Sequence, residues 1–373
     1  MAQVRLFEYV IKRYKKSMMV EAEQVEPSSP TPPHLSSINL SLVDQFSPNA
    51  YVPLLLFYSS SSYNAPSNPT TKIQSLSNSL SQALTKFYPL AGTINEDNLT
   101  IECNDRGVLV LVGRVTNCDL SQVLSRPDLE QLDQLLPTKE RDGKALFVIQ
   151  ISSFVCGGMA VGVYINHKIG DASSLSFFLN NWASIARADD VVIKSTESPV
   201  FGFESLFRRG QVPMLIGVNE KRERLVSRKF VFDSSTIAAL QTKHSIDSVP
   251  AKPPSRVMAV TAFLWRIAMN TEKNRRPTFM EISINLRGRM DPPLSDHHFG
   301  NLSVVTTTPV SHSTAVSSVS TERELVEHMK GLVRGIDNDY INRLQGGDEY
   351  LVLVQSIAKA EEMFVRGERQ GTR

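Results

Sequence analysis

The chain has 373 residues, of which 41% are hydrophobic, so it is long enough to bury the cores of about two domains. Its formal net charge is only +2, and no cluster of Lys and Arg marks a surface for nucleic acid. No run approaches the roughly 18 consecutive apolar residues of a membrane span. We therefore expect neither a nucleic-acid partner nor a membrane partner.

The three cysteines, Cys103, Cys118 and Cys156, lie far apart in the sequence. Their spacing matches no metal-binding motif, and an odd number fits no disulfide framework, which is typical of proteins from reducing compartments. We accordingly expect a cytoplasmic protein that binds no metal.

The first domain is expected over residues 20–190, after a basic extension of residues 1–19. That extension is interpreted as an added N-terminal stretch or, alternatively, as a targeting segment. Apolar periodicity separates strands from helices, and the continuous apolar run at Tyr51–Tyr58 indicates a buried strand. The other predicted strands are 38–43, 100–103, 108–115, 145–154 and 159–165, and the helices are 73–87, short pieces within 120–136, and 172–186.

Residues 191–225 are rich in Gly, Pro and charge, which indicates a crossover between domains. The second domain is expected over residues 226–373. Its predicted strands are 225–232, 279–286 and 302–309, and its predicted helices are 236–243, 256–269, 321–336 and 350–364.

A histidine follows the predicted strand 159–165, in the stretch Asn166-His167-Lys168-Ile169-Gly170-Asp171. An imidazole exchanges protons near neutral pH, so His167 is a candidate general base; the alternative is an ordinary, partly buried histidine. Asp171 is a favoured residue for capping the next helix, and it also suits orienting the histidine or anchoring the turn through an arginine. Gly170 suits a strained backbone angle or a close backbone approach.

Other catalytic motifs find no support. The sequence has no G-x-S-x-G, H-E-x-x-H, P-loop or G-x-G-x-x-G pattern, which argues against a serine nucleophile, zinc hydrolysis and nucleotide binding. Cys156 falls in a predicted hairpin turn with no basic neighbour to lower its pKa, so a thiol nucleophile is disfavoured.

A second group of polar residues, including Arg287 and Arg289, follows the predicted strand 279–286. Two arginines at the end of a strand suit an anion or a buried carboxylate. On spacing alone, a solvated surface pair is the favoured interpretation.

Several ordered blocks together resemble the plant BAHD acyl-CoA-dependent acyltransferases, over about residues 20–310. The pattern is most similar to the vinorine synthase-like branch, which acetylates alkaloid and terpenoid alcohols. The blocks are SSPTP at 28–32, LSLVDQF at 40–46, FYPLAGTI at 87–94, NHKIGDASS at 166–174, SRVMAVTAFLWR at 255–266, and NLRGRMDPPL with FGN at 285–301.

The resemblance implies an α/β fold of two chloramphenicol-acetyltransferase-like domains with mixed sheets and an active-site channel between them. It implies a monomeric enzyme of plant secondary metabolism that moves an acyl group, acetyl by preference, from CoA to an alcohol. His167 of the HXXXD motif is expected to act as general base, with no acyl-enzyme. Acyl-CoA is then a cosubstrate, and no permanently bound cofactor is expected.

The resemblance also implies supporting residues. Asp171 is expected to point away from the channel and to pair with Arg287, while Gly170 shapes the turn. Candidate CoA contacts are Ser255, Arg256 and Asn301; Arg275 and Arg276 suit CoA phosphates or solvent equally well.

The sequence departs from the family pattern at its C-terminal end. It contains no DFGWG motif, and after about Phe364 it continues as a polar stub to Arg373. We therefore expect the second domain to be truncated. The alternative function is a non-catalytic BAHD-like protein or an incomplete gene model.

Overall fold

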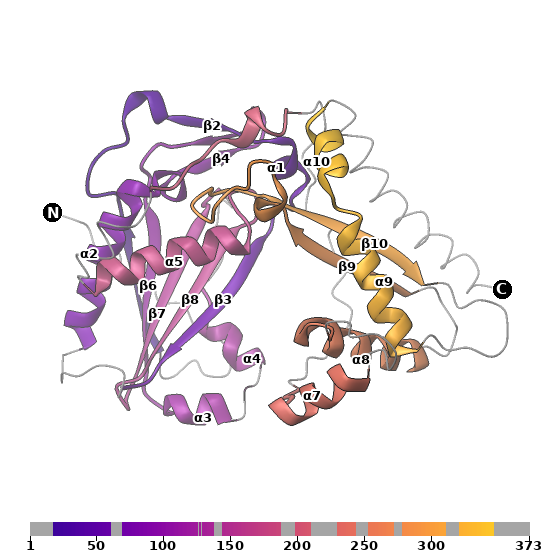
Figure 1. Cartoon of the computed structure of the whole chain (residues 1–373). Helices are drawn as coiled ribbons and strands as arrows, with labels where there is room; N and C mark the ends of the chain where they lie inside the picture. Colours follow the sequence, from indigo (N-terminus) through magenta and orange to yellow (C-terminus); the bar gives the residue numbers. More distant parts are fainter. Residues whose placement is uncertain are drawn as a thin grey trace, which may run out of the picture. The chain divides into compact units, whose positions relative to one another are not determined.

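The computed structural model describes residues 18–60, 69–125, 127, 129–137, 144–187, 198–209, 230–243, 253–271, 278–310 and 321–346. The chain has a mixed α/β architecture and divides into two compact units (Figure 1). The first unit comprises residues 1–223 and 295–302, and the second comprises 224–294 and 303–373. Segment 295–302 thus belongs to the first unit, whereas the sequence boundaries assign it to the second domain.

A five-stranded sheet forms the centre of the first unit. Its strands follow the order β1-β6-β7-β8-β3; β6 and β7 run parallel, and the other neighbours are antiparallel. β7 and β8 form the predicted hairpin, and its turn contains Cys156 and Gly157, whose φ of 80° suits glycine. The strands are β1 (Met18–Val25), β3 (Tyr51–Tyr58), β6 (Val108–Val115), β7 (Phe147–Phe154) and β8 (Met159–Asn166).

Alternating side chains give this sheet two apolar faces. On β8, Val161 and Val163 join the main core under α2 (Pro69–Lys86) and α5 (Ala172–Ala186). Ala160 instead joins a smaller cluster with residues of the short helices that follow β6. Figure 1 shows α5 lying across the strands, and α2 packs beside α5. The short helices are α3 (Leu120–Ser125), α4 (Leu129–Leu132) and η4 (Asp133–Leu135).

A three-stranded sheet of order β2-β5-β4 completes the first unit, together with short helices. Phe299 of segment 295–302 enters the core, with its ring centroid 5.7 Å from that of Phe87 and 5.4 Å from that of Phe201. The elements are η1 (Pro33–Leu35), β2 (Ser37–Asn39), α1 (Leu42–Phe46), η3 (Tyr88–Ala91), β4 (Thr93–Asn95), β5 (Thr100–Glu102) and η5 (Phe203–Ser205).

The second unit pairs a two-stranded antiparallel sheet of β9 and β10 with helices. Its apolar cluster includes Trp265 of α8 and Leu325 of α9. Among the helices in the described part of the chain, none is long and apolar enough to cross a membrane. The elements are α7 (Ser234–Lys243), α8 (Arg256–Thr271), β9 (Thr278–Asn285), η6 (Arg287–Arg289), β10 (Ser303–Val310), α9 (Glu322–Arg334) and α10 (Asn338–Gln345).

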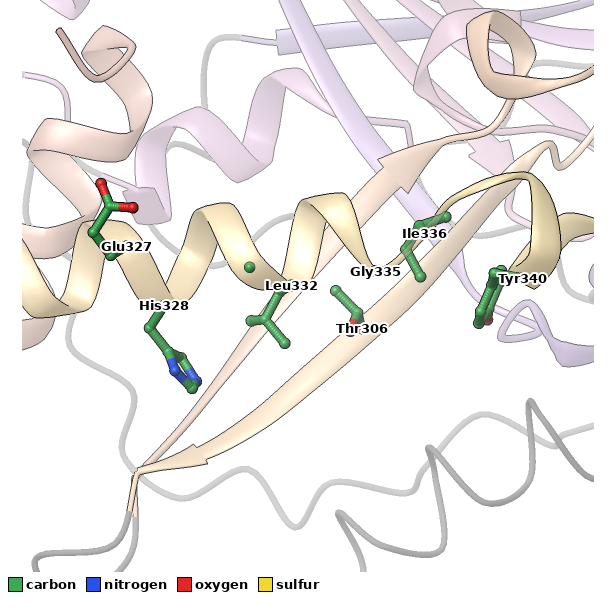
Figure 2. Close-up of a pocket in the computed structure, with 8 residues that line it drawn as sticks. Thr306, Glu327, His328, Leu332, Gly335, Ile336 and Tyr340 are labelled. Atoms are coloured by element: carbon green, nitrogen blue, oxygen red, sulfur yellow. The ribbon is translucent and has the colours of Figure 1, made fainter. Parts of the chain in front are cut away.

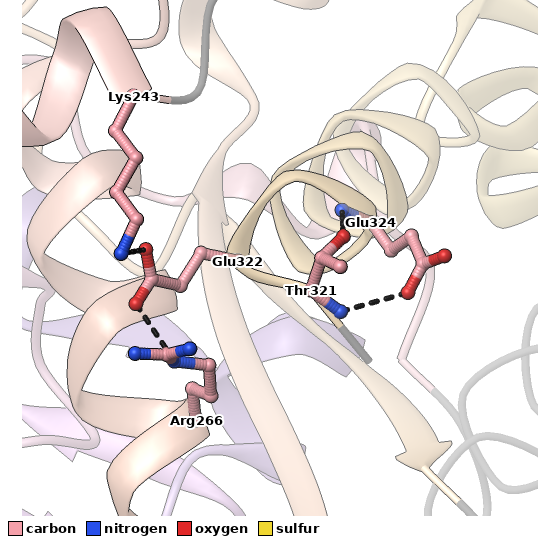
Figure 3. Close-up of polar contacts among 5 residues, drawn as sticks. All are labelled: Lys243, Arg266, Thr321, Glu322 and Glu324. Atoms are coloured by element: carbon pink, nitrogen blue, oxygen red, sulfur yellow. Dashed lines mark hydrogen bonds and ion pairs between the residues drawn. The ribbon is translucent and has the colours of Figure 1, made fainter. Parts of the chain in front are cut away.

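A buried carboxylate links three helices of the second unit (Figure 3). The side chain of Glu322, only 2% exposed, lies 2.9 Å from Lys243 Nζ of α7 and 2.7 Å from Arg266 Nε of α8. Beside it, Thr321 and Glu324 form a capping box at the start of α9. Polar contacts therefore supplement a small apolar core in this unit.

The structure corrects three sequence predictions. The strand at Tyr51–Tyr58 is an edge strand, half-buried rather than buried, which suits its proline because an edge position needs no N–H donor there. The strand predicted over 38–43 stops at Asn39, since Ser41 caps helix α1 instead. Residues 230–232 are not in a strand; Phe230 and Val231 are 71% and 79% exposed, so neither packs on a sheet.

The longer helices predicted from apolar periodicity are confirmed as α2, α5, α8 and α9, each within a few residues of its expected ends. Other predictions lie outside the described residues. These are residues 1–17 of the extension, most of the crossover 191–225, the helix 350–364, and the pair Arg275 and Arg276; the last two residues of the predicted extension, Met18 and Met19, begin β1.

Candidate active site

His167 directly follows β8, at the end where β8 pairs with the start of β3. Its backbone N–H donates to the Ala50 carbonyl at 2.9 Å, and its side chain is half-buried. The strand pairing therefore fixes the main chain at the histidine, while the imidazole keeps access to its surroundings.

Asn166 shapes the turn that carries the histidine; residues 166–171 are called the His167 turn below. Its side-chain oxygen accepts from the Lys168 N–H at 2.9 Å, and its amide donates to Asn49 Oδ1 at 2.8 Å. Asn166 is 1% exposed. A buried asparagine with both ends of its amide paired holds a tight turn in one conformation.

Lys168 turns inward and is fully buried. Its Nζ donates to the carbonyl oxygens of Asp44, at 3.2 Å, and Gln45, at 2.7 Å, in helix α1. The last carbonyls of a helix lack partners within the helix, and Lys168 supplies a donor to both of these, although the Asp44 carbonyl also accepts from the Ser47 N–H at 3.2 Å. Burial lowers the pKa of Lys168 to about 8, against the opposing effect of the negative charge on Asp44.

Asp44 is the second buried charged group beside the turn, at 7% exposure. Its Oδ2 accepts from Ser41 N at 3.0 Å and from Ser41 Oγ at 2.6 Å, which completes the capping box of α1. Its Oδ1 accepts from Asn301 N at 3.2 Å and from Asn301 Nδ2 at 2.9 Å. Burial raises the pKa of Asp44, although these donors oppose the rise.

Asn301 connects Asp44 to the histidine. Its Nδ2 also donates to the His167 carbonyl at 2.7 Å, and its Oδ1 lies 3.1 Å from His167 Nδ1. The sequence predicts Asn301 as a CoA contact. The residue is 1% exposed in the structure, and its amide already has protein partners at both ends.

Asp171 caps helix α5, as one of its two predicted roles requires. Its Oδ1 accepts from Ser174 N and Ser174 Oγ, each at 3.0 Å. Its Oδ2 accepts from the Leu302 N–H at 3.1 Å, next to Asn301. Asp171 therefore joins the first turn of α5 to segment 295–302.

Gly170 fits a close approach rather than a strained backbone angle. A Cβ at this position would lie 2.9 Å from Ser174 Cβ and 3.2 Å from Phe299 Cε1. Its φ lies outside the positive range that favours glycine. Lack of space is thus the physical reason for glycine here.

The other predicted site residues belong to the second unit. Arg287 in η6 is 2% exposed, and its backbone N–H donates to Asn285 Oδ1 at 3.0 Å. Ser255 Oγ accepts from Met258 N at 3.2 Å and so caps α8, and Arg256 is exposed. The Asp171–Arg287 ion pair and the CoA contacts of Ser255 and Arg256 stay predictions.

A hollow of about 460 Å³ lies in the second unit, between β10 and the helices α9 and α10 (Figure 2). Its lining is mixed, with Leu332 and Ile336 beside Glu327 and His328. It contains none of the residues that the sequence singled out for chemistry. It therefore offers no catalytic constellation comparable to the His167 turn.

Cys156, the rival nucleophile, lies at the opposite end of β8 from His167. The strand has 8 residues, which span roughly 26 Å at about 3.3 Å per residue. The thiol and the imidazole are therefore too far apart to act as a pair. In the described ranges, no group of three or more His, Cys, Asp and Glu residues gathers in a way that suits a metal ion.

Asp44 and Lys168 are not among the site residues predicted from the sequence. One local signal was present for Asp44: Ser41-Leu42-Val43-Asp44 has the spacing of a helix capping box. For Lys168 the sequence gives no such signal, because a lysine in a turn is usually solvated and its carbonyl partners lie more than 120 residues earlier.

With this geometry in place, comparison with known proteins decides the family. A model of the Transferase family matches residues 16–362. The chain belongs to this family, the BAHD acyltransferases. A limonoid 21-O-acetyltransferase from Melia azedarach is 32% identical to it over 365 residues, which cover 93% of this chain and 82% of the relative. Vinorine synthase from Rauvolfia serpentina is 35% identical over 299 residues, covering 77% and 69% of the two chains.

Solved structures agree on the BAHD fold. The crystal structure of vinorine synthase superposes with a TM-score of 0.71 at 30% identity, covering 90% of this chain and 80% of its own. TRI101 of F. sporotrichioides, solved with coenzyme A and T-2, has a TM-score of 0.55 at 15% identity, with 85% and 77% covered. The second likeness concerns the fold alone. The predicted resemblance to BAHD acyltransferases is confirmed, and the chain is an acyltransferase.

Proposed function

We propose that this BAHD acyltransferase moves an acyl group, acetyl by preference, from CoA to a hydroxyl of a plant specialised metabolite. The acetyl preference is supported by the limonoid O-acetyltransferase among its relatives. The CoA donor is supported by the BAHD family and by the coenzyme A complex of the structurally similar TRI101. The acceptor is a small-molecule alcohol.

The observation that carries the proposal is the placement of His167. The histidine directly follows β8, its main chain is fixed by Ala50, and among the described residues its half-buried ring has one hydrogen-bond partner, Asn301. A general base needs both a fixed ring and a nitrogen that remains available for proton transfer. His167 meets both requirements.

In the proposed reaction, His167 accepts the proton of the acceptor hydroxyl while the oxygen attacks the thioester carbonyl of acyl-CoA. The tetrahedral intermediate then expels the CoA sulfur, and the histidine returns the proton to that sulfur. The products are an ester and free CoA thiol. No acyl-enzyme is needed, in keeping with the distance between Cys156 and His167 along β8.

The CoA contacts are proposed at the start of α8. Ser255 caps this helix and Arg256 presents an exposed guanidinium in its first turn. Arginine and backbone N–H groups at a helix N-terminus both favour phosphate. Loss of this contact is expected to raise the KM for acyl-CoA.

The proposal is tested by following thiol release from acetyl-CoA with a panel of alcohols. His167→Ala is expected to lower the rate by about 10²–10⁴-fold, the usual contribution of a general base. His34→Ala, which removes an exposed histidine of the same unit, serves as the control and is expected to keep the wild-type rate. Equal rates for His167→Ala and wild type would show that His167 is not the base. No thiol release from the wild-type chain with any alcohol or acyl-CoA would favour the non-catalytic alternative.

A further inference from the structure

The amide of Asn301 has only one orientation that its surroundings accept. Its Nδ2 carries two protons and faces two acceptors, Asp44 Oδ1 at 2.9 Å and the His167 carbonyl at 2.7 Å. Rotating the amide by 180° would place Asn301 Oδ1 against Asp44 Oδ1 and the His167 carbonyl oxygen, and none of these three atoms carries a proton to donate. Chemistry therefore assigns the oxygen of Asn301 to the remaining position, 3.1 Å from His167 Nδ1.

This orientation decides which nitrogen of His167 carries the proton. An amide oxygen only accepts hydrogen bonds, so the nitrogen facing it must be the donor. The neutral imidazole then holds its proton on Nδ1 and its lone pair on Nε2. Within the part of the chain that the structure describes, Nε2 makes no hydrogen bond of its own.

Asp44 makes the orientation of Asn301 stable. Its Oδ1 holds both the backbone N–H and the side-chain amide of Asn301, and its Oδ2 is fixed by Ser41. Both residues are buried, at 7% and 1% exposure, so water offers little competition for these bonds. A buried acceptor left without its donor is costly, which opposes any flip of the amide.

We propose that Asn301, oriented by Asp44, is a positioning residue that selects the Nδ1–H tautomer of His167. The reacting nitrogen is then Nε2. This inference rests on His167 being the general base of the proposed function. It gives Asn301 a role that differs from the CoA contact expected from the sequence.

The tautomer can be observed without measuring activity. Histidines labelled with ¹⁵N report by NMR which ring nitrogen is protonated, and the His167 signals are assigned by their loss in His167→Gln. At a pH where the ring is neutral, wild-type His167 is expected as the Nδ1–H form. A wild-type ring protonated on Nε2 would overturn the inference even if His167→Ala confirmed the base.

Variants then separate the two roles of Asn301. Asn301→Ala removes the acceptor, so the His167 ring is expected to lose its single tautomer, and kcat is expected to fall at least about tenfold, as for other residues that orient a functional histidine. The KM for acetyl-CoA is expected to stay within about twofold. A raised KM with unchanged kcat and an unchanged tautomer would support the CoA contact and overturn the positioning role.

Asn301→Asp is a control for the possibility that Asn301→Ala disrupts the fold around His167. It keeps an acceptor oxygen for Nδ1, so the Nδ1–H form is expected to persist even if the new carboxylate weakens the contact with Asp44. Asn181→Ala is the matched control; this buried amide at 7% exposure donates to Phe177 O within α5. It is expected to keep the wild-type tautomer. A ring that shifts equally in Asn181→Ala and Asn301→Ala would count against the inference.

Discussion

Two buried carboxylates, Asp44 beside the His167 turn and Asp171 at its end, both accept hydrogen bonds from segment 295–302. Asp44 holds Asn301, whose side chain continues to the imidazole. Asp171 holds the backbone of Leu302 and the first turn of α5. The Asp44 contacts thus lead through Asn301 to the His167 ring. The Asp171 contacts involve the Leu302 backbone and the cap of α5. Residues on the Asp44 side are therefore expected to affect catalysis, and residues on the Asp171 side to affect mainly stability.

The largest loss of stability is expected for Asp171→Ala. The change removes the helix cap, worth about 1 kcal/mol, and leaves the buried Leu302 N–H without an acceptor, worth about 1–3 kcal/mol. Urea unfolding is expected to show a fall in unfolding free energy of about 3 kcal/mol. Unchanged stability would contradict the structural role of Asp171.

Asp171→Asn sharpens that result, because asparagine caps helices as well as aspartate but carries no charge. Asparagine has only one side-chain oxygen, so with the cap kept the buried Leu302 N–H still loses its acceptor, at a cost of about 1–3 kcal/mol. If the predicted ion pair with Arg287 also forms, a buried unpaired arginine should cost about 3–5 kcal/mol. Both variants remove the charge, so the ion pair is tested by the size of the loss in Asp171→Asn itself, and the difference between the two variants reports the helix cap.

A smaller loss is expected for Gly170→Ala. The new methyl group would press on Ser174 Cβ at 2.9 Å and on the Phe299 ring at 3.2 Å, and overpacking of this kind costs about 1–3 kcal/mol. Thermal unfolding measures it. Gly331→Ala in α9 is the control, since nothing lies within 4 Å of that position and alanine favours a helix by about 0.5–1 kcal/mol. If both variants changed the unfolding temperature equally, crowding would not be the reason for glycine at position 170.

The most gradual effect is a pH dependence on the Asp44 side, where stability changes over several pH units. The pKa of Lys168 is about 8 in the folded chain, below its ordinary value of 10.5, so the unfolded chain binds more protons between these pH values. Stability therefore rises with pH across this window, by at most about 1.4 kcal/mol per pH unit. Lys168→Met should remove that rise. Parallel stability curves for variant and wild type between pH 8 and 10 would contradict it.

The sequence predicts those parts of the site that depend on near neighbours. His167 at a strand end and Asp171 as a helix cap follow from patterns within about ten residues, and both are found. Asp44, Lys168 and the orientation of Asn301 depend on partners more than 100 residues away. No local pattern encodes such contacts, because they exist only after the chain has folded.

The distinction between local patterns and long-range contacts also explains why some strand predictions were wrong. The apolar run at Tyr51–Tyr58 has the composition of a central strand. In the five-stranded sheet, however, this strand pairs with β8 alone, so it is an edge strand. Helices α2 and α5 were predictable because their apolar faces repeat at helical spacing. Strand order is a property of the whole sheet, and hydrophobic pattern alone does not determine it.

The reach of segment 295–302 back into the first unit bears on how the protein is made. His167 and Asn301 are separated by 134 residues, and Asp44 and Asn301 by 257. A ribosome adding roughly 5–20 residues per second needs on the order of ten seconds to pass from His167 to Asn301. During that interval the nascent chain carries Asp44 and the histidine without their asparagine. The proposed arrangement of His167, Asn301 and Asp44 is consequently completed late in synthesis, well after the five strands of the central sheet have been made.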